Sequence, residues 1–218
     1  LSLATTYFNI GLAFDYLDHP EFDEASNKKM AERYYLLMTE IYNTNAITDK
    51  YASSYYAHIA SFYDTQFDYS KASLYRELAD KTFPHDDKST KNKKNYVKLL
   101  IGKSKSLINA EEFQSAEDNL VTALTISTEN SFNDDLTFSR IHEGFSKLYR
   151  KTNKFIKAKY HISKAIKIAT DNDKISEKNL NFYKRQFAYI LKSEGRFKDA
   201  EKILLDVKAS HFNKGSKV

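Results

Sequence analysis

The sequence predicts an all-α protein, built as a right-handed α-solenoid of five helical hairpins with about ten helices. Three observations carry this prediction: turn-forming residues are scarce, apolar residues recur at helical spacing, and one pattern of small and aromatic residues returns about every 42 residues. Only five Gly and two Pro occur in 218 residues, too few for a turn-rich β architecture. Because 41% of the residues are apolar and 14% aromatic, the chain can bury a large interior, and we expect no cofactor.

The clearest copy of the pattern runs from Tyr55 to Pro84. Its first half places one apolar stripe at helical spacing, and after a short polar break its second half places another before Pro84 ends the helix. The two stripes consist of Tyr56, Ile59, Ala60 and Tyr63, and of Tyr69, Ala72, Tyr75, Arg76 and Ala79. Small residues at Ala60 and Ala72 allow two helices to cross closely, so this stretch is expected to form a helical hairpin.

The hairpin recurs along the whole chain at a nearly constant spacing. An alanine of the second helix returns at intervals of 41, 44, 42 and 42 residues, at Ala31, Ala72, Ala116, Ala158 and Ala200. In four copies a small residue lies twelve places before that alanine, at Ala60, Ser104, Ser146 and Ala188. In the same four an aromatic residue lies three places before it, at Tyr69, Phe113, Phe155 and Phe197. Two offsets kept across four copies indicate an internal repeat.

The order of these residues (bulky, small, aromatic, Ala, then Pro) resembles the tetratricopeptide repeat (TPR). The period near 42 resembles the longer variety found in kinesin light chains and in bacterial peptide-pheromone receptors. The resemblance covers nearly the whole chain, and it rests on packing residues. It implies stacked hairpins whose first helices line a concave groove that binds a protein or a peptide.

The pattern sets approximate boundaries. We expect one superhelical domain over residues 1–210, with hairpins at about 3–44, 49–83, 89–128, 134–170 and 176–209, and a tail or linker over 211–218. Four residues that precede apolar runs are of types that cap helix N-termini: Asp49, Ser89, Asp134 and Ser176. Gly195 lies where a first helix should end.

The first copy departs from the pattern, because Ala31 follows Gly11 by twenty places and not by twelve. The eight extra residues are expected to loop out within the acidic segment 18–27. This loop is either a partner contact or an insertion, and we favour an insertion because surface loops accept added length at small cost.

The residue types give little support to catalysis or metal binding. The six His are scattered and form no HExxH or other ligand spacing, so we expect no metal site and no enzyme. The absence of Cys excludes disulfides and thiolate chemistry and leaves the redox compartment open, although we favour a cytoplasmic over a periplasmic location. No window is apolar enough to span a membrane.

The concave face of the predicted solenoid is basic over its last three hairpins. Among fourteen positions that the repeat register turns toward this face, eight are Lys or Arg and one, Glu143, is acidic, whereas the whole chain has 34 bases and 29 acids. The candidate binding residues are Lys98, Lys105, Asn109, Arg140, Lys147, Arg150, Lys151, Phe182, Arg185, Tyr189 and Lys192. The alternative is that these Lys and Arg form ordinary solvated helix faces.

These features favour a protein- or peptide-binding module with an acidic or carboxylate-bearing partner. The chain begins with Leu1, and with the resemblance this suggests the receptor or scaffold region of a larger bacterial signalling protein. One alternative is nucleic-acid binding through residues 147–167, which we do not expect because acids are abundant elsewhere and no base-reading motif occurs. The other is a passive structural spacer.

Overall fold

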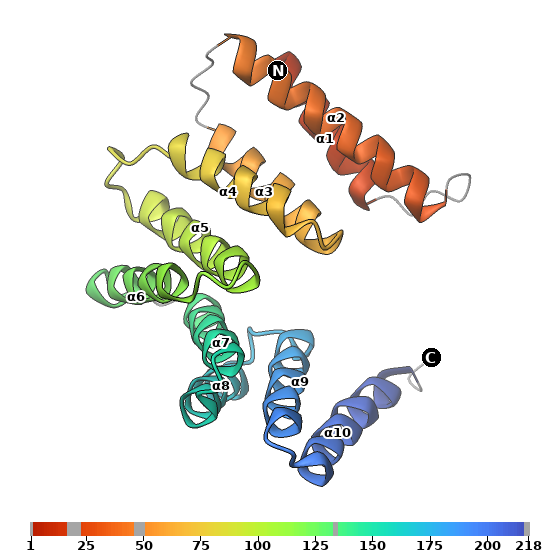
Figure 1. Ribbon diagram of the computed structural model, residues 1–218, viewed down its shortest axis with the longest axis vertical. Coiled ribbons are helices and arrows are strands. Elements are labelled where there is room, and N and C mark those ends of the chain that lie inside the picture. Colours follow the sequence, from red (N-terminus) through yellow and green to blue (C-terminus); the bar gives the residue numbers. More distant parts are fainter. Residues whose placement is uncertain (1, 17–22, 46–50, 133–134, 216–218) are drawn as a thin grey trace. The chain divides into compact units, whose positions relative to one another are not determined.

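The computed structural model describes residues 2–16, 23–45, 51–132 and 135–215, and these residues form ten α-helices and no strand (Figure 1). The predicted all-α class is therefore confirmed. The helices are α1 (Leu3–Tyr16), α2 (Glu24–Asn45), α3 (Ala52–Thr65), α4 (Tyr69–Lys81), α5 (Thr90–Asn109), α6 (Phe113–Glu129), α7 (Asp135–Lys151), α8 (Phe155–Asp171), α9 (Glu177–Ser193) and α10 (Phe197–Gly215). None of the helices in these ranges is both long and apolar enough to cross a membrane.

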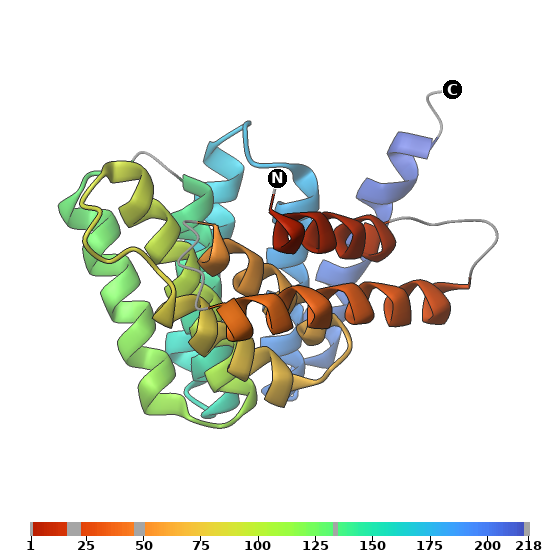
Figure 2. The same cartoon turned by 90° about the horizontal axis from the view of Figure 1, so that it is seen from above.

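The chain consists of two compact units, Leu1–His85 with α1 to α4 and Asp86–Val218 with α5 to α10. Consecutive helices pair as hairpins, α1 with α2 and α3 with α4 in the first unit, and α5 with α6, α7 with α8 and α9 with α10 in the second (Figure 2). Within the second unit α7 also contacts α5 and α6, and α9 contacts α7 and α8, so its three hairpins stack in chain order. That the two units form a single domain stays a prediction.

The small residues of the repeat lie where the helices of a hairpin cross. Ala72, Ala116 and Ala158 are completely buried, and so are Ala60 and Ala188 on the facing helices. Ser104 takes the same buried place on α5, and its hydroxyl donates to the carbonyl of Ile101 at 2.7 Å, which satisfies a polar group inside the packing. The twelve-residue offset read from the sequence thus marks a real crossing point.

Four hairpin turns share one backbone design. At each turn one residue has a positive φ: 60° at Phe67, 63° at Glu111, 58° at Asn153 and 79° at Gly195. The next residue donates its N–H to a carbonyl five residues earlier over 2.8 to 3.0 Å, which is the hydrogen bond of a Schellman motif. The turn is followed two residues later by the aromatic residue that begins the second helix. The repeated turn explains why the aromatic keeps its place in the pattern.

Several boundaries differ from the sequence-based expectation. The acidic segment 18–27 does not loop out throughout, because α2 begins at Glu24 and Asp23 caps it by accepting the Ser26 N–H at 2.7 Å. Helix α10 continues to Gly215, into the expected tail. The spacing of the second helices also predicts that Leu204, four places after Ala200, lies in the core, but it is 41% exposed on this last helix.

Two of the four predicted caps can be compared with the structure, and both are confirmed. The side chains of Ser89 and Ser176 accept the N–H of the third residue of α5 and α9. The other two, Asp49 and Asp134, lie outside the described residues, as do residues 18–22 of the acidic segment.

Candidate functional site

The second unit brings cations from two neighbouring helices into one cluster. On α7, Arg140, Glu143, Lys147 and Arg150 follow one another at intervals of three, four and three residues, which keeps them on one face. On α5, Lys105 and Asn109 lie one turn apart. The Lys147 Nζ donates to Asn109 Oδ1 over 2.9 Å, and this hydrogen bond joins the two faces.

Glu143 lies on the same face of α7 as Arg140, Lys147 and Arg150. Burial raises the pKa of its carboxyl group, while the positive charges of Lys147, Lys105, Arg150 and Arg140 oppose that rise. Charge–charge interactions act over several ångströms, so these four cations contribute together to the electrostatic environment of one carboxyl group. We call Lys105, Asn109, Arg140, Glu143, Lys147 and Arg150 the α5–α7 cluster; it holds four positive charges against one ionisable acid.

The α5–α7 cluster extends electrostatically to α9. Burial raises the pKa of Tyr183 to about 12, with a further rise from Glu143 and an opposing effect of Arg140. Tyr183 is 2% exposed and belongs to the hydrophobic core of the second unit. A partly dehydrated setting of this kind strengthens each charge–charge interaction compared with open water.

The remaining predicted site residues lie on the same helices, and most of them are open to solvent. Lys98 on α5, Lys151 at the end of α7 and Lys192 on α9 are exposed, and Arg185 is half-buried. Phe182 and Tyr189 expose 37% and 47% of their surface on α9. Their participation in binding, like that of the cluster itself, stays a prediction.

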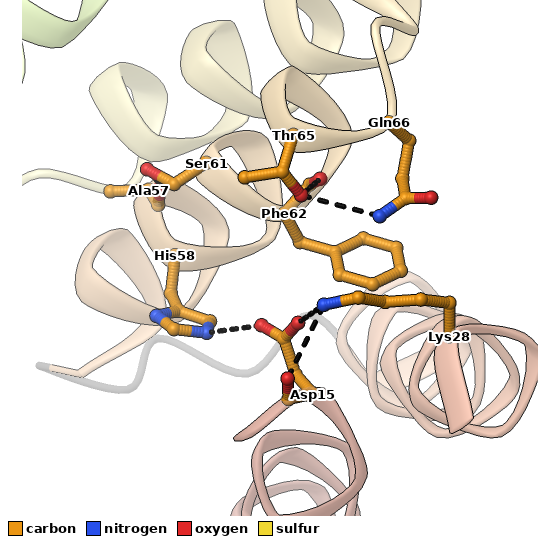
Figure 3. A network of polar contacts seen from close by, with 8 residues as sticks. All are labelled: Asp15, Lys28, Ala57, His58, Ser61, Phe62, Thr65 and Gln66. Carbon is orange, nitrogen blue, oxygen red and sulfur yellow. Dashed lines mark hydrogen bonds and ion pairs between the residues drawn. The ribbon is translucent and has the colours of Figure 1, made fainter. Parts of the chain in front are cut away.

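In the first unit, first-helix residues form a neutralising network in place of a basic surface (Figure 3). The Asp15 carboxylate contacts Lys28 Nζ at 2.6 Å and His58 Nε2 at 3.4 Å, joining α1, α2 and α3. Burial raises the pKa of Asp15, but hydrogen bonds from His58 and Lys28 outweigh it, and the net pKa is lowered. Lys28 also lies 5.7 Å from the centre of the Phe62 ring.

The repeat register predicts that Asp64, four places after Ala60 on α3, faces the concave groove, but this prediction is wrong. Asp64 and Arg76 form a buried ion pair at 2.6 Å between α3 and α4, with 3% and 6% of their side chains exposed. The register error arises because a buried Arg at a second-helix core position needs a counter-charge, and Asp64 supplies it.

The sequence did not predict the histidine pair inside the fourth hairpin. His142 of α7 and His161 of α8 face each other with their Nδ1 atoms 3.0 Å apart, and the Phe145 ring stacks on His161 at 4.8 Å. Burial lowers the pKa of both imidazoles to about 4, assisted by the positive charge of Lys164. His142 lies four places before Ser146 and His161 three places after Ala158, so the antiparallel crossing could have revealed the pair.

The described part of the chain holds no group of three His, Asp or Glu side chains that could bind a metal ion. The ring Nε2 of His85 contacts the Asp80 carbonyl oxygen at 3.2 Å near the end of α4.

Comparison of the structure with solved proteins identifies the fold. The apo form of RapI matches with a TM-score of 0.71 at 15% identity, covering 98% of this chain and 72% of that one. TPR-like repeats of a putative kinesin light chain from Podosopora anserina match at 0.66, with 10% identity and coverage of 94% and 92%. BtubC from P. vanneervenii matches at 0.65, with 15% identity and coverage of 99% and 91%. No protein-family model and no curated sequence matches this chain.

These structural relatives confirm the TPR-type repeat fold that the internal repeat predicts. At 10 to 15% identity the likeness concerns the fold. Function therefore has to be argued from the side chains of this chain.

Proposed function

We propose that this chain is a protein- or peptide-binding module of a larger bacterial signalling or regulatory protein, and that it binds an acidic or carboxylate-bearing segment at the α5–α7 cluster. The observation that carries the proposal is the row of Arg140, Lys147 and Arg150 on one face of α7, which the Lys147–Asn109 hydrogen bond of 2.9 Å joins to α5. TPR-type hairpins stack their first helices side by side, which suits them to hold an extended segment.

The two kinds of cation in the cluster have different roles. Arg140 and Arg150 present planar guanidinium groups that recognise a carboxylate through two parallel hydrogen bonds. Lys147 is held toward α5 by Asn109, so its charge is positioned before a partner arrives. Preorganised charges of this kind favour rapid association with an acidic segment and select against basic ones.

Glu143 supplies an internal counter-charge to the same cations. In the absence of a partner its carboxylate partly neutralises the cluster, and a carboxylate of the partner then competes with it for Arg140 and Lys147. The raised pKa of Glu143 allows its proton uptake to accompany binding of an anion. Acidic segments are therefore expected to bind more tightly as the pH falls toward the pKa of Glu143.

The test is the affinity for a fluorescein-labelled poly-glutamate peptide with a free C-terminal carboxylate, measured by fluorescence anisotropy. Replacing Arg140 and Arg150 together with Ala is expected to weaken binding by roughly 2 to 5 kcal/mol if both ion pairs are desolvated. The matched control is Arg33→Ala with Lys81→Ala, which removes two exposed cations from the first unit. If both double variants lose the same affinity for the peptide, net charge alone explains the loss and the proposal is overturned.

A random-sequence DNA duplex separates the alternatives. The eight Lys and Arg between residues 147 and 168, without an acid among them, favour nucleic acid as the second candidate. If DNA binds more tightly than the peptide at every salt concentration, the nucleic-acid function replaces the proposed one. A passive spacer would bind neither.

The extent of the site on α9 is tested by the single variant Arg185→Ala, which changes a half-buried cation of that helix. Weaker binding of the poly-glutamate peptide by this variant would show that the site extends onto α9.

A further inference from the structure

A second concavity lies among the last three helices of the second unit, away from the residues of the α5–α7 cluster. It has a volume of about 340 Å³ and is lined by α8, α9 and α10. Its floor is apolar, with Ile166 from α8, Phe187 from α9 and Ile203 from α10. Its rim carries Lys167, Lys184 and Asp206. We call it the α8–α10 groove.

The α8–α10 groove is preformed, because its floor is anchored in the core. Phe187 and Ile203 pack against the buried cluster of Ala188, Leu191 and Ala200, and Ile166 packs against the main core. At the rim, Lys184 Nζ contacts Asp206 Oδ2 at 2.7 Å and ties α9 to α10. This ion pair also neutralises the acid of the rim, so the net charge of the rim is set by Lys167 of α8.

The outward face of α8 next to the groove is basic and partly apolar. Lys157, Lys164 and Lys167 are exposed there, together with Tyr160 and Ile156, and Ile156 has 82% of its surface open. Lys164 Nζ lies 4.7 Å from the centre of the Tyr160 ring. No acid occurs between Lys147 and Ile168, so nothing on this helix face before Asp171 offsets the lysines.

We propose that the α8–α10 groove is a second docking surface, which takes an acidic peptide segment that inserts one bulky apolar side chain between α8 and α10 and lays its carboxylates along Lys164 and Lys167. Charge complementarity assigns the acidic character, and the apolar floor assigns the inserted side chain. A phosphate backbone would satisfy the lysines but would leave the floor of Ile166, Phe187 and Ile203 unfilled, which favours a peptide over nucleic acid. The groove is separate in sequence and in lining residues from the α5–α7 cluster.

The probe is a fluorescein-labelled peptide, Glu-Asp-Glu-Leu-Phe-Glu-Asp-Glu with an amidated C-terminus, and its partner probe has Ser-Ser in place of Leu-Phe. Burial of an apolar side chain in the groove should make the first peptide bind about tenfold to a hundredfold more tightly than the second. Equal affinity for the two peptides would overturn the proposal, since the apolar floor would then have no part in binding.

Two variants locate the site. Ser163 is exposed and borders the groove, so Ser163→Trp should block the groove without disturbing the core. This variant should bind the Leu-Phe peptide about tenfold more weakly than wild type does. Lys164→Glu with Lys167→Glu should remove the preference for the Leu-Phe peptide over the Ser-Ser peptide, while the charge-matched control Arg33→Glu with Lys81→Glu should retain it.

The Arg140→Ala and Arg150→Ala double variant keeps the two proposals apart. It should keep the wild-type preference for the Leu-Phe peptide over the Ser-Ser peptide, whatever happens to the poly-glutamate peptide. Wild-type binding by both groove variants would refute the groove as the site. A DNA duplex is added as a competitor. If it displaces the peptide, and if Ser163→Trp still binds the duplex normally, the lysines of α8 bind nucleic acid and the groove proposal is overturned.

Discussion

Acidification should destabilise the second unit through the His142–His161 pair. Both imidazoles are held neutral in the folded chain with pKa values of about 4, whereas an unfolded histidine titrates near 6.5. Between these two values the unfolded chain binds more protons than the folded chain, so the free energy of unfolding falls as the pH falls. From pH 7 to pH 5 this linkage amounts to about 2 kcal/mol per imidazole, or about 4 kcal/mol for the pair.

The assay is urea unfolding followed by circular dichroism at a series of pH values in that range. Carboxyl groups titrate mainly below it, so the slope in this window reports the histidines. The variant His142→Gln with His161→Gln retains polar side chains that can pair without titrating, and it should flatten the slope. The control is His85→Gln, because the His85 side chain is 52% exposed. Identical slopes for wild type and the double variant would refute the burial argument.

Three further predictions concern packing and backbone. Ala158→Leu should lower the free energy of unfolding, measured with urea, by about 1 to 3 kcal/mol because Ala158 is fully buried at the α7–α8 crossing. The control Ser163→Leu, on the exposed face of α8, should cost little. Equal stability of the two variants would contradict the close packing of Ala158 at this crossing. Gly195→Ala should lower the free energy of unfolding by about 1 kcal/mol. The cause is the φ of 79° alone, since an added Cβ meets no atom within 4 Å. An unchanged free energy of unfolding would contradict that backbone conformation. Arg76→Ala should cost about 3 to 5 kcal/mol by removing the cation that pairs with the buried Asp64 carboxylate, and Arg76→Ala with Asp64→Ala should recover part of this loss. If the double variant recovers nothing, the two residues are not coupled.

The repeat fold could be predicted from the sequence because its evidence is local. The twelve-residue offset between Ser104 and Ala116 is set by two helices and the turn between them, and the structure places both residues at a buried crossing. The same offset predicts where α5, α7 and α9 present their faces. Since Arg140, Lys147 and Arg150 lie on one helix, their common face also followed from helical spacing alone.

What the sequence did not reveal depends on contacts between helices or on unusual backbone. Phe67, Glu111 and Asn153 have positive φ values although they are not glycines, so their types do not mark a turn in the sequence. Only Gly195 could be identified as a turn residue. The His142–His161 contact and the Asp64–Arg76 ion pair need the relative rotation of two helices, which a one-residue uncertainty in register obscures. The start of α2 at Glu24 was missed because an acidic, polar segment does not distinguish a loop from a capped first turn.

The most direct test of the α5–α7 cluster as an anion-binding site is the affinity of Glu143→Gln for the poly-glutamate peptide. The substitution removes the internal counter-charge and nearly preserves the shape of the side chain. Relative to wild type, the account predicts binding that is about threefold to tenfold tighter and less dependent on pH. Equal or weaker binding, with the pH dependence of wild type, would contradict it.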